Sequence, residues 1–489
     1  MLLTKLKSLP VCWSAKLILL TLVVSGLGSG CGHRDSRLFW TDGQWIRDSS
    51  GRVFISRGLN LSDDNKFPSP VTGEFIPNWF NADCFAEIAS WGFNTVRFVM
   101  TWEGLEPEPG QYNEQYLGRL EQAAEWARAA GIYLIFDMHQ DLYARKFHGD
   151  GAPEWAVLDE GLYFLPLGNG VSPSLWYLNY TSPAVEKAFD NFYGDTNGIQ
   201  DHFIEAWRRV AERFPGNPAV VGYDLLNEPF PGSRLLQLDD FDRDYFQPFY
   251  EKLISSLLQV DSDHLFFLEP DAMRTNFLGE SGFPSGFSKF PIAQDKLVFA
   301  PHFYDPDVTV TLDYDGDISR LEKTMDSLVQ EARRLQVPIW VGEWGLWGGA
   351  AGHGEKFLAD QLTVYDQYLA SDSYWDYSRN PTDTASPVNS TWIQENLIRP
   401  QPSFIAGIPT ALNYDVAAGK FELKFTEEKA GLASEIIVPT RFCQPGDCRV
   451  EMEPVRSNSW EAGKSQGVNI LKVLSNSKGT EFTIRISKD

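Results

Sequence analysis

Two glutamates far apart in the chain each follow a pattern typical of a buried strand. Residues 219–226 are almost continuously apolar and precede Glu228, and residues 337–342 precede Glu343. Such runs are typical of strands covered on both faces, as in a parallel sheet. A carboxylate at the end of a buried strand costs desolvation free energy, which favours a chemical role over a packing role. We therefore expect Glu228 and Glu343 to face each other.

Other polar residues also fall at or just past the ends of predicted strands. They are Arg97, His139, Asn227, His302, Tyr304 and Trp375. In a barrel of parallel strands the carboxyl ends of the strands converge on one face, where active sites are built. We expect these residues to share one site with the two glutamates.

Two carboxyl groups on one rim suit the hydrolysis of a glycosidic bond with retention of configuration. In that reaction the two groups lie about 5–5.5 Å apart. Glu343 is predicted to be the nucleophile, oriented by Tyr304 and kept ionised by Arg97. Glu228 is predicted to be the acid/base, with His302 as its partner, a role that needs a raised pKa.

Two other hydrolytic chemistries are less well supported. A zinc hydrolase would use His139, Asp141 and His302, but residues 139–141 lack the His-Glu-x-x-His spacing of a helical zinc site. For a serine nucleophile elbow, Ser29 lies in a predicted signal segment and residues 279–282 have the wrong spacing. We expect no cofactor and no bound metal.

The composition fits a large enzyme with neutral substrates. The chain has 489 residues, of which 43% are hydrophobic, including 16 Trp, 18 Tyr and 33 Phe, enough for a packed core and for an aromatic ligand groove. A formal net charge of −24 argues against a nucleic-acid partner, which needs a basic face. It also disfavours docking to anionic membranes by charge alone.

Strand and helix patterns alternate over most of the chain. The strand patterns are 53–60, 94–100, 132–138, 219–226, 264–268, 297–300, 337–342 and 373–377, and the helix patterns are 82–91, 112–130, 198–214, 241–258, 318–335 and 354–370. This alternation predicts an α/β fold, a (β/α)8 TIM barrel, interrupted by a long irregular insertion at 142–196. A doubly wound sheet would carry a glycine-rich phosphate loop after the first strand, and residues 57–60 lack that spacing.

The pattern changes near residue 398. Short alternating runs at 419–425, 434–439 and 481–486 are typical of antiparallel strands separated by turns. We assign residues 40–397 to the catalytic barrel and residues 398–489 to a C-terminal β-sandwich.

The cysteines point to an oxidising compartment. Cys443 and Cys448 frame a turn-rich tetrapeptide, which favours a hairpin disulfide over a metal site. Cys84 stands alone on a helical pattern and is expected to be buried and inert.

Residues 1–31 have the pattern of an export signal. Lys5 and Lys7 precede the apolar run 17–24, and small residues lead to Cys31. The apolar run is too short to span a bilayer comfortably. We expect an exported protein, either secreted or anchored as a lipoprotein through Cys31. Leu27 lies four residues before Cys31 rather than the usual three, which leaves both possibilities open.

The strand-end residues together resemble the retaining family 5 glycoside hydrolases. The resemblance is carried by Arg97, His139, Leu226-Asn227-Glu228-Pro229, His302-x-Tyr304, Glu343-Trp344-Gly345 and Trp375. It implies that the Glu of Asn-Glu-Pro is the acid/base and that the later Glu is the nucleophile. These are Glu228 and Glu343, the same roles that their positions suggest, and Asn227 is placed to hydrogen-bond the sugar 2-hydroxyl.

The closer resemblance is to the endoglycoceramidase branch of that family, whose members release an intact glycan from ceramide. It is carried by residues 57–60, 136–141, 374–377 and 398–400. It implies that Lys66 and Asp141 contact the sugar and that an apolar groove holds the ceramide. The aromatic residues of 155–193 could line that groove or fold as a lid on the barrel.

We therefore expect a β-glycosidase that separates glycan from ceramide in glycosphingolipids. A monohexosylceramide hydrolase or β-glucanase of the same family, and a non-catalytic glycolipid-binding protein, are the alternatives. The presence of both Glu228 and Glu343 argues against the last. The expected partner is the glycosphingolipid, with transient contact to a membrane or micelle surface and no nucleic acid. We expect a monomer whose C-terminal domain has a structural role.

Overall fold

The computed structural model describes residues 38–61, 65–69, 73–76, 80–166, 173–275, 285–346 and 353–488. Ser36–Asp489 form one compact unit. The export signal predicted at residues 1–31 lies outside the described residues and stays a prediction. Within the described ranges, no helix combines the length and the apolar character needed to cross a membrane.

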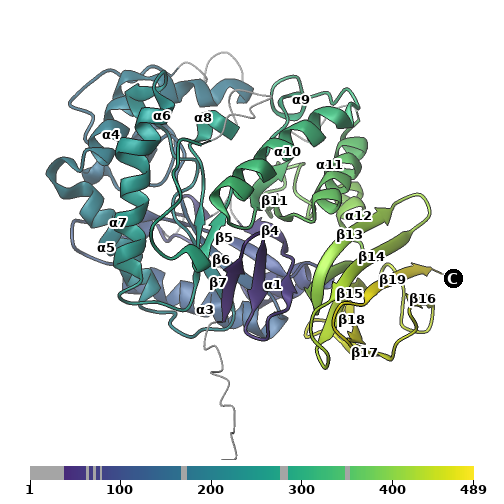
Figure 1. Cartoon of the computed structure of the whole chain (residues 1–489). Coiled ribbons are helices and arrows are strands. Elements are labelled where there is room, and N and C mark those ends of the chain that lie inside the picture. The colour runs from purple at the N-terminus through teal and green to yellow at the C-terminus, as the bar shows by residue number, and fades with distance from the viewer. Residues whose placement is uncertain are drawn as a thin grey trace, which may run out of the picture. The chain divides into compact units, whose positions relative to one another are not determined.

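Eight parallel strands form the barrel at the centre of Figure 1. They are β4 (Arg57–Leu61), β5 (Thr95–Thr101), β6 (Tyr133–His139), β7 (Val220–Asp224), β8 (Leu265–Leu268), β9 (Leu297–Phe299), β10 (Trp340–Gly345) and β11 (Ser371–Tyr377). Neighbours pair in the order β10-β11-β4-β5-β6-β7-β8-β9, and a parallel bridge between Phe299 and Ile339 closes the ring. The predicted (β/α)8 barrel is confirmed.

Helices follow the barrel strands, most of them between one strand and the next, and the longer ones pack around the barrel. They are α1 (Ala82–Ser90), α2 (Trp102–Leu105), α3 (Glu114–Ala130), α5 (Ile199–Ala211), α6 (Leu238–Phe241), α7 (Gln247–Leu257), α8 (Ala272–Thr275), α9 (Pro306–Thr309), α10 (Ile318–Leu335), α11 (Gly354–Tyr368) and α12 (Thr391–Leu397). Local sequence sets their ends. The Asn113 side chain accepts from the N–H of Tyr116 to start α3, and Gly131, at φ +81°, ends it.

The insertion after β6 is more ordered than its sequence suggested. It contains the short helices η2 (Arg145–Phe147), η3 (Glu154–Ala156) and η4 (Pro173–Thr181) and a full α-helix, α4 (Pro183–Tyr193). Pro183 stands in the first turn of α4, a position that proline favours. Val185, Phe189 and Phe192 are buried on the inner face of α4. The expectation of an irregular segment was therefore wrong for α4, because aromatic and proline content obscured a helical period.

Three N-terminal strands close the amino-terminal end of the barrel. They are β1 (Phe39–Asp42), β2 (Trp45–Asp48) and β3 (Val53–Phe54). Phe39, Ile46 and Phe54 pack against the first inward-facing side chains of the barrel strands, such as Val221 and Leu265. The predicted first strand, 53–60, is thus divided between β3, which pairs with β2, and the barrel strand β4.

The C-terminal strands form two sheets that enclose a second core. The strands are β12 (Gln401–Ile405), β13 (Gly407–Asp415), β14 (Lys420–Glu427), β15 (Ala433–Pro439), β16 (Cys448–Glu453), β17 (Asn458–Ala462), β18 (Val468–Leu474) and β19 (Glu481–Lys488). One sheet has the order β13-β14-β19-β16, and the other is β1-β2-β3-β12-β15-β18-β17. The second sheet therefore includes the N-terminal strands, a pairing that the sequence did not indicate.

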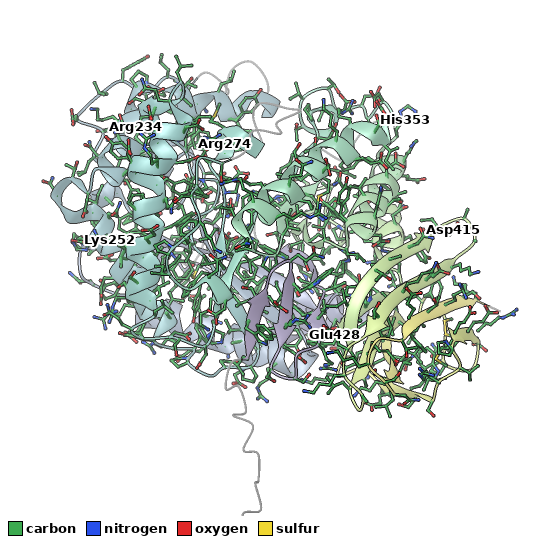
Figure 2. All side chains as sticks on the ribbon, viewed as in Figure 1. Arg234, Lys252, Arg274, His353, Asp415 and Glu428 are labelled. Carbon is green, nitrogen blue, oxygen red and sulfur yellow. A yellow bond between two sulfur atoms is a disulfide. The ribbon has the colours of Figure 1, made fainter. Side chains whose placement is uncertain are left out.

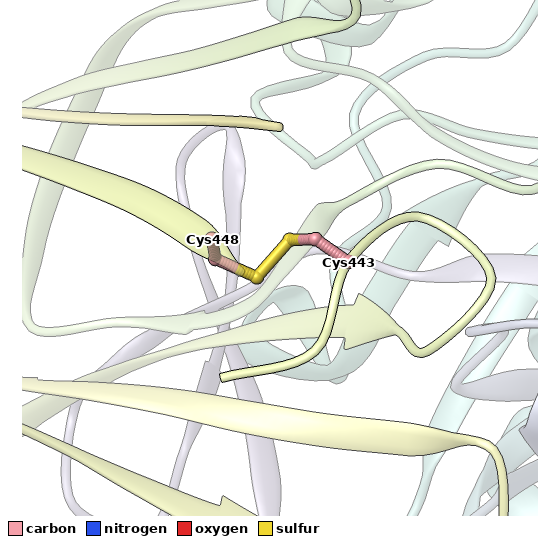
Figure 3. The surroundings of a disulfide bond; sticks show 2 residues. All are labelled: Cys443 and Cys448. Carbon is pink, nitrogen blue, oxygen red and sulfur yellow. A yellow bond between two sulfur atoms is a disulfide. The ribbon is translucent and has the colours of Figure 1, made fainter. Parts of the chain in front are cut away.

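A disulfide joins Cys443 to Cys448 next to β16 (Figure 3). It closes a turn whose N–H groups at Asp447 and Cys448 both donate to the carbonyl of Gln444. Cys84, the free cysteine of the described residues, is buried on α1, as its helical pattern suggested.

Ion pairs tie the C-terminal strands to the rest of the chain. Arg47 of β2 donates to Glu428 at 2.7 Å, and Figure 2 shows Glu428 beside the N-terminal strands. Arg399 makes two hydrogen bonds of 2.7 Å to the buried carboxylate of Asp366 on α11. A two-point Arg–carboxylate contact fixes orientation as well as distance.

Candidate active site

Glu343 lies on β10 with both carboxylate oxygens bonded. Arg97 of β5 donates to Oε1 at 2.6 Å, and the hydroxyl of Tyr304 donates to Oε2 at 3.0 Å. The carbonyl of Glu343 also accepts from the N–H of Phe303, which holds β10 against the segment after β9. The Glu343 side chain is therefore fixed in one direction.

Glu228 follows β7 in a conformation that side-chain-bearing residues rarely adopt, with φ at +41°. Neighbouring side chains hold that backbone on both sides. The N–H of Glu228 donates to Oε2 of Glu269 at 2.8 Å, and Gln140 donates to the Glu228 carbonyl at 2.9 Å. The Glu228 side chain then reaches His302, whose Nδ1 lies 2.9 Å from Oε1. We infer that the strained turn serves to aim this carboxyl group.

The two glutamates lie close enough to act on one bond. A carboxylate oxygen of each, with a ring nitrogen of His302, lie within 4.8 Å of one another. Retention requires a carboxyl separation of about 5–5.5 Å, whereas inversion requires about 6.5–9.5 Å to admit a water. An approach of 4.8 Å or less is too short for the inverting arrangement and favours retention.

The environments of the two glutamates move their pKa values apart. Burial, with the charge of Glu343, raises the pKa of Glu228, although His302 opposes the shift. Burial also acts to raise the pKa of Glu343, but the charges of His302 and Arg97 outweigh it and hold that pKa below its usual value. One carboxyl group thus tends to keep its proton while its neighbour is ionised, the division that acid/base and nucleophile roles need.

Arg97 is the fully buried cation at the centre of the site. Its guanidinium lies 2.6–3.0 Å from carboxylate oxygens of Glu343, Asp137, Asp224 and Glu269. It also donates to the side-chain oxygens of Asn60 at 3.1 Å and Asn227 at 2.9 Å. This arrangement orients residues from several strands with one planar group.

His302 is a second buried cation. Burial opposes its charge, but the carboxylates of Glu269 and Glu343, together with its bond to Glu228, raise the pKa of His302 well above its ordinary value. Its Nε2 lies 3.2 Å from Glu269 and its Nδ1 lies 3.6 Å from Glu343. A charged His302 stabilises ionised Glu343. Its bond to Glu228 also couples the charge of His302 to the gain or loss of a proton by Glu228.

A second polar group lies beside the glutamates. Lys66 contacts Asp141 at 2.7 Å and stands 4.5 Å from the ring centroid of Trp375. The ring of His139 stacks on Trp375 at 5.6 Å, and its Nδ1 lies 2.7 Å from Asp137. Burial and Lys66 act to lower the pKa of His139, but Asp137 and Asp141 raise it to about 10. These charged groups offer hydrogen-bond donors and acceptors suited to sugar hydroxyls.

Both groups of residues line one cavity of about 500 Å³. Its lining includes the polar residues Lys66, His139, Asp141, Asp150, Asn227, Glu228, Tyr304 and Glu343, and the more apolar residues Phe67, Trp176, Tyr177, Pro306, Thr309, Val310 and Trp375. The cavity lies at the carboxyl ends of the strands. In Figure 1 this end carries α8 and α9, and in Figure 2 it can be found by the label of Arg274, a residue of α8. This is the face on which barrel active sites are built.

The structure brings together all of the residues proposed from the sequence. Eight of the ten line the cavity, and Arg97 and His302 lie beneath it and bond to the glutamates. The set named by the zinc alternative is divided, because His302 lies with the glutamates while His139 lies with Asp141 and Asp150. The chain also carries a Gly-x-Ser-x-Gly pattern at 463–467, which lies between β17 and β18, where the Ser465 hydroxyl donates to the carbonyl of Ala130. It is no strand-to-helix elbow.

Several residues of the site were not anticipated. Asp137, Asp224, Glu269 and Asn60 surround Arg97, and Asp150 and Phe67 line the cavity. The sequence did contain a signal for the first group. Arg97 is a charged residue inside an apolar strand, and such a residue needs buried partners. Of the aromatic insertion, Trp176 and Tyr177 reach the cavity. Trp155 packs on Trp102 and His202 instead, so the insertion is partly wall and partly packing.

A parallel barrel with two carboxyl groups at this separation on its carboxyl-terminal rim defines a retaining glycoside hydrolase. Comparison with known proteins agrees. Residues 48–381 match the family model described as cellulase (glycosyl hydrolase family 5), and residues 399–486 match that of the glycoside hydrolase family 5 C-terminal domain.

The chain is similar to endoglycoceramidases over most of its length. It is 27% identical to endoglycoceramidase I of Rhodococcus hoagii over 460 residues, which cover 91% of this chain and 87% of the relative. It is 30% identical to endo-glycoceramidase II from Rhodococcus sp., solved as its lactosyl-enzyme intermediate. The TM-score is 0.77, and the match covers 91% of this chain and 100% of that structure. The match to the ganglioside GM3 complex of that enzyme has 29% identity and a TM-score of 0.77, and it covers 92% of this chain and 100% of that structure. The chain belongs to glycosyl hydrolase family 5, as an endoglycoceramidase-like member.

Proposed function

We propose that this enzyme cleaves the bond between the glycan and the ceramide of glycosphingolipids. The observation that carries the proposal is the composition of the cavity. Charged and hydrogen-bonding groups beside Glu228 and Glu343 and apolar side chains line the same 500 Å³ space. A lipid-linked sugar needs both surfaces. The similarity to enzymes named endoglycoceramidase supports the same substrate class.

Glu343 is proposed as the nucleophile and Glu228 as the acid/base. Glu343 attacks the anomeric carbon while Glu228 protonates the departing ceramide oxygen, which leaves a glycosyl ester on Glu343. Glu228, now ionised, takes a proton from water, and that water displaces Glu343 to release the glycan with its configuration retained. The raised pKa of Glu228 and the lowered pKa of Glu343 support this assignment over the reverse.

The polar residues of the lining, together with Trp375, are proposed to hold the sugar. Lys66 and Asp141 form one ion pair that can exchange hydrogen bonds with hydroxyl groups, and Trp375 offers a ring face against which a sugar can pack. Asn227 is held by Arg97 and Gln140, so its amide has a fixed direction toward the reacting sugar.

The other apolar residues of the lining are proposed to hold the ceramide. Phe67 and Val310 line the cavity and yet keep 43% and 47% of their surface exposed. Exposed apolar groups at the edge of a binding cavity favour a ligand that covers them. They also suit transient contact with a membrane or micelle that presents the lipid.

Product analysis tests the substrate proposal. The enzyme is incubated in parallel with a ganglioside, lactosylceramide, monohexosylceramides and cellulose, and the products are separated by chromatography. We expect free ceramide together with an intact oligosaccharide from the first two. Release from monohexosylceramides alone would favour the narrower hydrolase, and cello-oligosaccharides alone would overturn the proposal. Binding of glycolipid without any cleavage would favour the non-catalytic alternative.

Replacing Glu228 tests its role as acid/base. Glu228→Gln should lower kcat/KM for lactosylceramide by about 10²–10⁴-fold, because the poor leaving group has lost its proton donor. A dinitrophenyl glycoside needs no protonation, so its first step should be much less affected. In the wild type, activity should fall as pH rises through the raised pKa of Glu228, and this alkaline limb should be absent from the first step of Glu228→Gln. Equal losses on both substrates would contradict the assignment.

A further inference from the structure

Asp150 lies directly opposite Asp141 in the loop that follows β6. The N–H of Asp150 donates to the Asp141 carbonyl at 2.8 Å, and the N–H of Asp141 donates to the Asp150 carbonyl at 3.3 Å, an antiparallel bridge. Opposite residues of such a pair carry their side chains on the same face. The loop therefore presents two aspartate side chains to one point on the cavity wall.

The two glycines beside Asp150 show how closely the loop folds back. A Cβ atom on Gly149 would lie 1.7 Å from the carbonyl oxygen of Asp141, and a Cβ atom on Gly151 would lie 2.5 Å from the Cβ atom of Gln140. Neither distance can be accommodated by a larger residue without moving the backbone. The glycines at 149 and 151 therefore allow the loop to place Asp150 directly against Asp141.

The proximity of the two carboxyl groups limits their charge. A carboxyl oxygen of each, with a ring nitrogen of His139, lie within 4.8 Å of one another. Asp150 is 1% exposed, and its Oδ1 has no hydrogen-bond partner among the described residues. Two carboxyl groups this close, one of them fully buried, disfavour a second negative charge, so one of them tends to keep its proton at neutral pH.

The surrounding charges decide which carboxyl group keeps it. Lys66 lies 2.7 Å and His139 lies 3.5 Å from Oδ2 of Asp141, so both cations favour ionised Asp141. Burial and the charge of Asp141 raise the pKa of Asp150 to about 8. Two further titratable groups line the same cavity, His148 in the loop and Glu228 beyond β7. These charges together favour an ionised Asp141 and a protonated Asp150.

We propose that Asp150 is a positioning residue of the sugar site, which shares its proton with Asp141 and thereby fixes that carboxylate to accept a hydrogen bond from a sugar hydroxyl. The inference rests on the proposed role of Asp141 in sugar binding. Loss of the proton would place a second negative charge beside Asp141 and draw Lys66 between two carboxylates. Sugar binding should then weaken at alkaline pH while Asp141 itself stays ionised.

Carbon-13 NMR of protein labelled at aspartate carboxyl groups tests the protonation directly and needs no ligand. The Asp150 resonance is assigned by its loss in Asp150→Asn. We expect a midpoint near pH 8. In Asp141→Asn the like charge is gone while Lys66 and His139 remain, so the midpoint should fall, although the burial of Asp150 still opposes its ionisation. A midpoint below about 5 in the unmodified loop would overturn the proposal.

Lactose binding, measured by calorimetry from pH 6 to pH 10 in the Glu228→Gln protein, tests the consequence. We expect Kd to rise about tenfold above pH 8 when Asp150 is present. Asp150→Ala should weaken binding at every pH, and Asp150→Asn, which keeps a donor, should weaken it less and remove the pH dependence. Asp159→Asn, in the same insertion but paired with Lys146, is the control and should behave as the parent.

Two outcomes of the calorimetry have different meanings. Coincident pH profiles for the parent protein and its Asp150→Asn variant would overturn the inference. Absence of lactose binding throughout would instead count against the proposed sugar site, and the NMR midpoint would still decide where the proton resides.

Discussion

Glu343→Ala is expected to lower kcat for glycolipid hydrolysis by about 10⁵-fold or more. The glycosyl ester forms on this carboxylate, so its removal takes away the covalent step rather than weakening it. The loss should be chemical and not structural, because the acids that surround Arg97 remain bound by it. Steady-state kinetics with lactosylceramide, together with circular dichroism to confirm folding, checks the result.

Azide distinguishes a missing nucleophile from a damaged site. In Glu343→Ala the space of the lost carboxylate admits a small anion, which can attack an activated aryl glycoside from the same face. The product should be a glycosyl azide of inverted configuration, since only one displacement occurs. In Glu228→Gln azide should instead attack the glycosyl-enzyme and give a product of retained configuration. Opposite configurations from the two variants would separate the two roles.

A matched control keeps this result specific. Glu355 is an exposed glutamate in the first turn of α11, and Glu355→Ala should leave kcat unchanged. Glu343→Gln should still bind glycolipid with an affinity close to that of the wild type, because the change removes charge but little volume. Activity of Glu343→Ala above about 1% of the wild type would show that the nucleophile lies elsewhere.

The position of the site could be predicted because barrel topology brings strand ends together. Glu228 and Glu343 are separated by more than a hundred positions, but each follows an apolar strand run, and a closed parallel barrel places all such ends on one rim. Residue type then limited the chemistry to acid, base and nucleophile. The pairing of His302 with Glu228 and of Tyr304 with Glu343 followed from the same register.

Pairings that depend on tertiary contact could not be predicted. Val53 and Phe54 have the pattern of a strand, but the pattern does not say that they join β2 and β12 rather than the barrel. Asp150 lies in a loop with no period of its own, and its contact with Asp141 depends on the close approach that Gly149 permits. The bonds of Arg97 to Asp137 and Asp224 required the stagger between neighbouring strands, which local sequence does not encode.

Arg97→Met is expected to have the largest effect on stability of any single change in the site. The side chains have similar length, but the guanidinium that lies within 3.0 Å of Asp137, Asp224, Glu269 and Glu343 is lost. Removing one partner of a buried ion pair costs about 3–5 kcal/mol, because it leaves uncompensated charge in a medium that solvates it poorly. Urea unfolding at pH 7 measures the change. Arg128→Met, at an exposed pair with Glu125, is the control and should cost less than about 1 kcal/mol.

The pH dependence of Arg97→Met tests the physical cause. Arg97 helps to hold the pKa of Glu343 below its usual value, so in the wild type this carboxylate stabilises the fold above its unfolded pKa and loses that contribution as pH falls through its folded pKa. Without Arg97 less positive charge opposes the effect of burial, so the folded pKa of Glu343 should rise, although His302 still lowers it. The variant's deficit in unfolding free energy should therefore be largest at neutral pH and shrink as the solution is acidified. The acid limb of kcat/KM, which reports ionised Glu343, should move to higher pH by about 1–3 pH units. A deficit that does not change with pH would show that Arg97 acts through packing and not through charge.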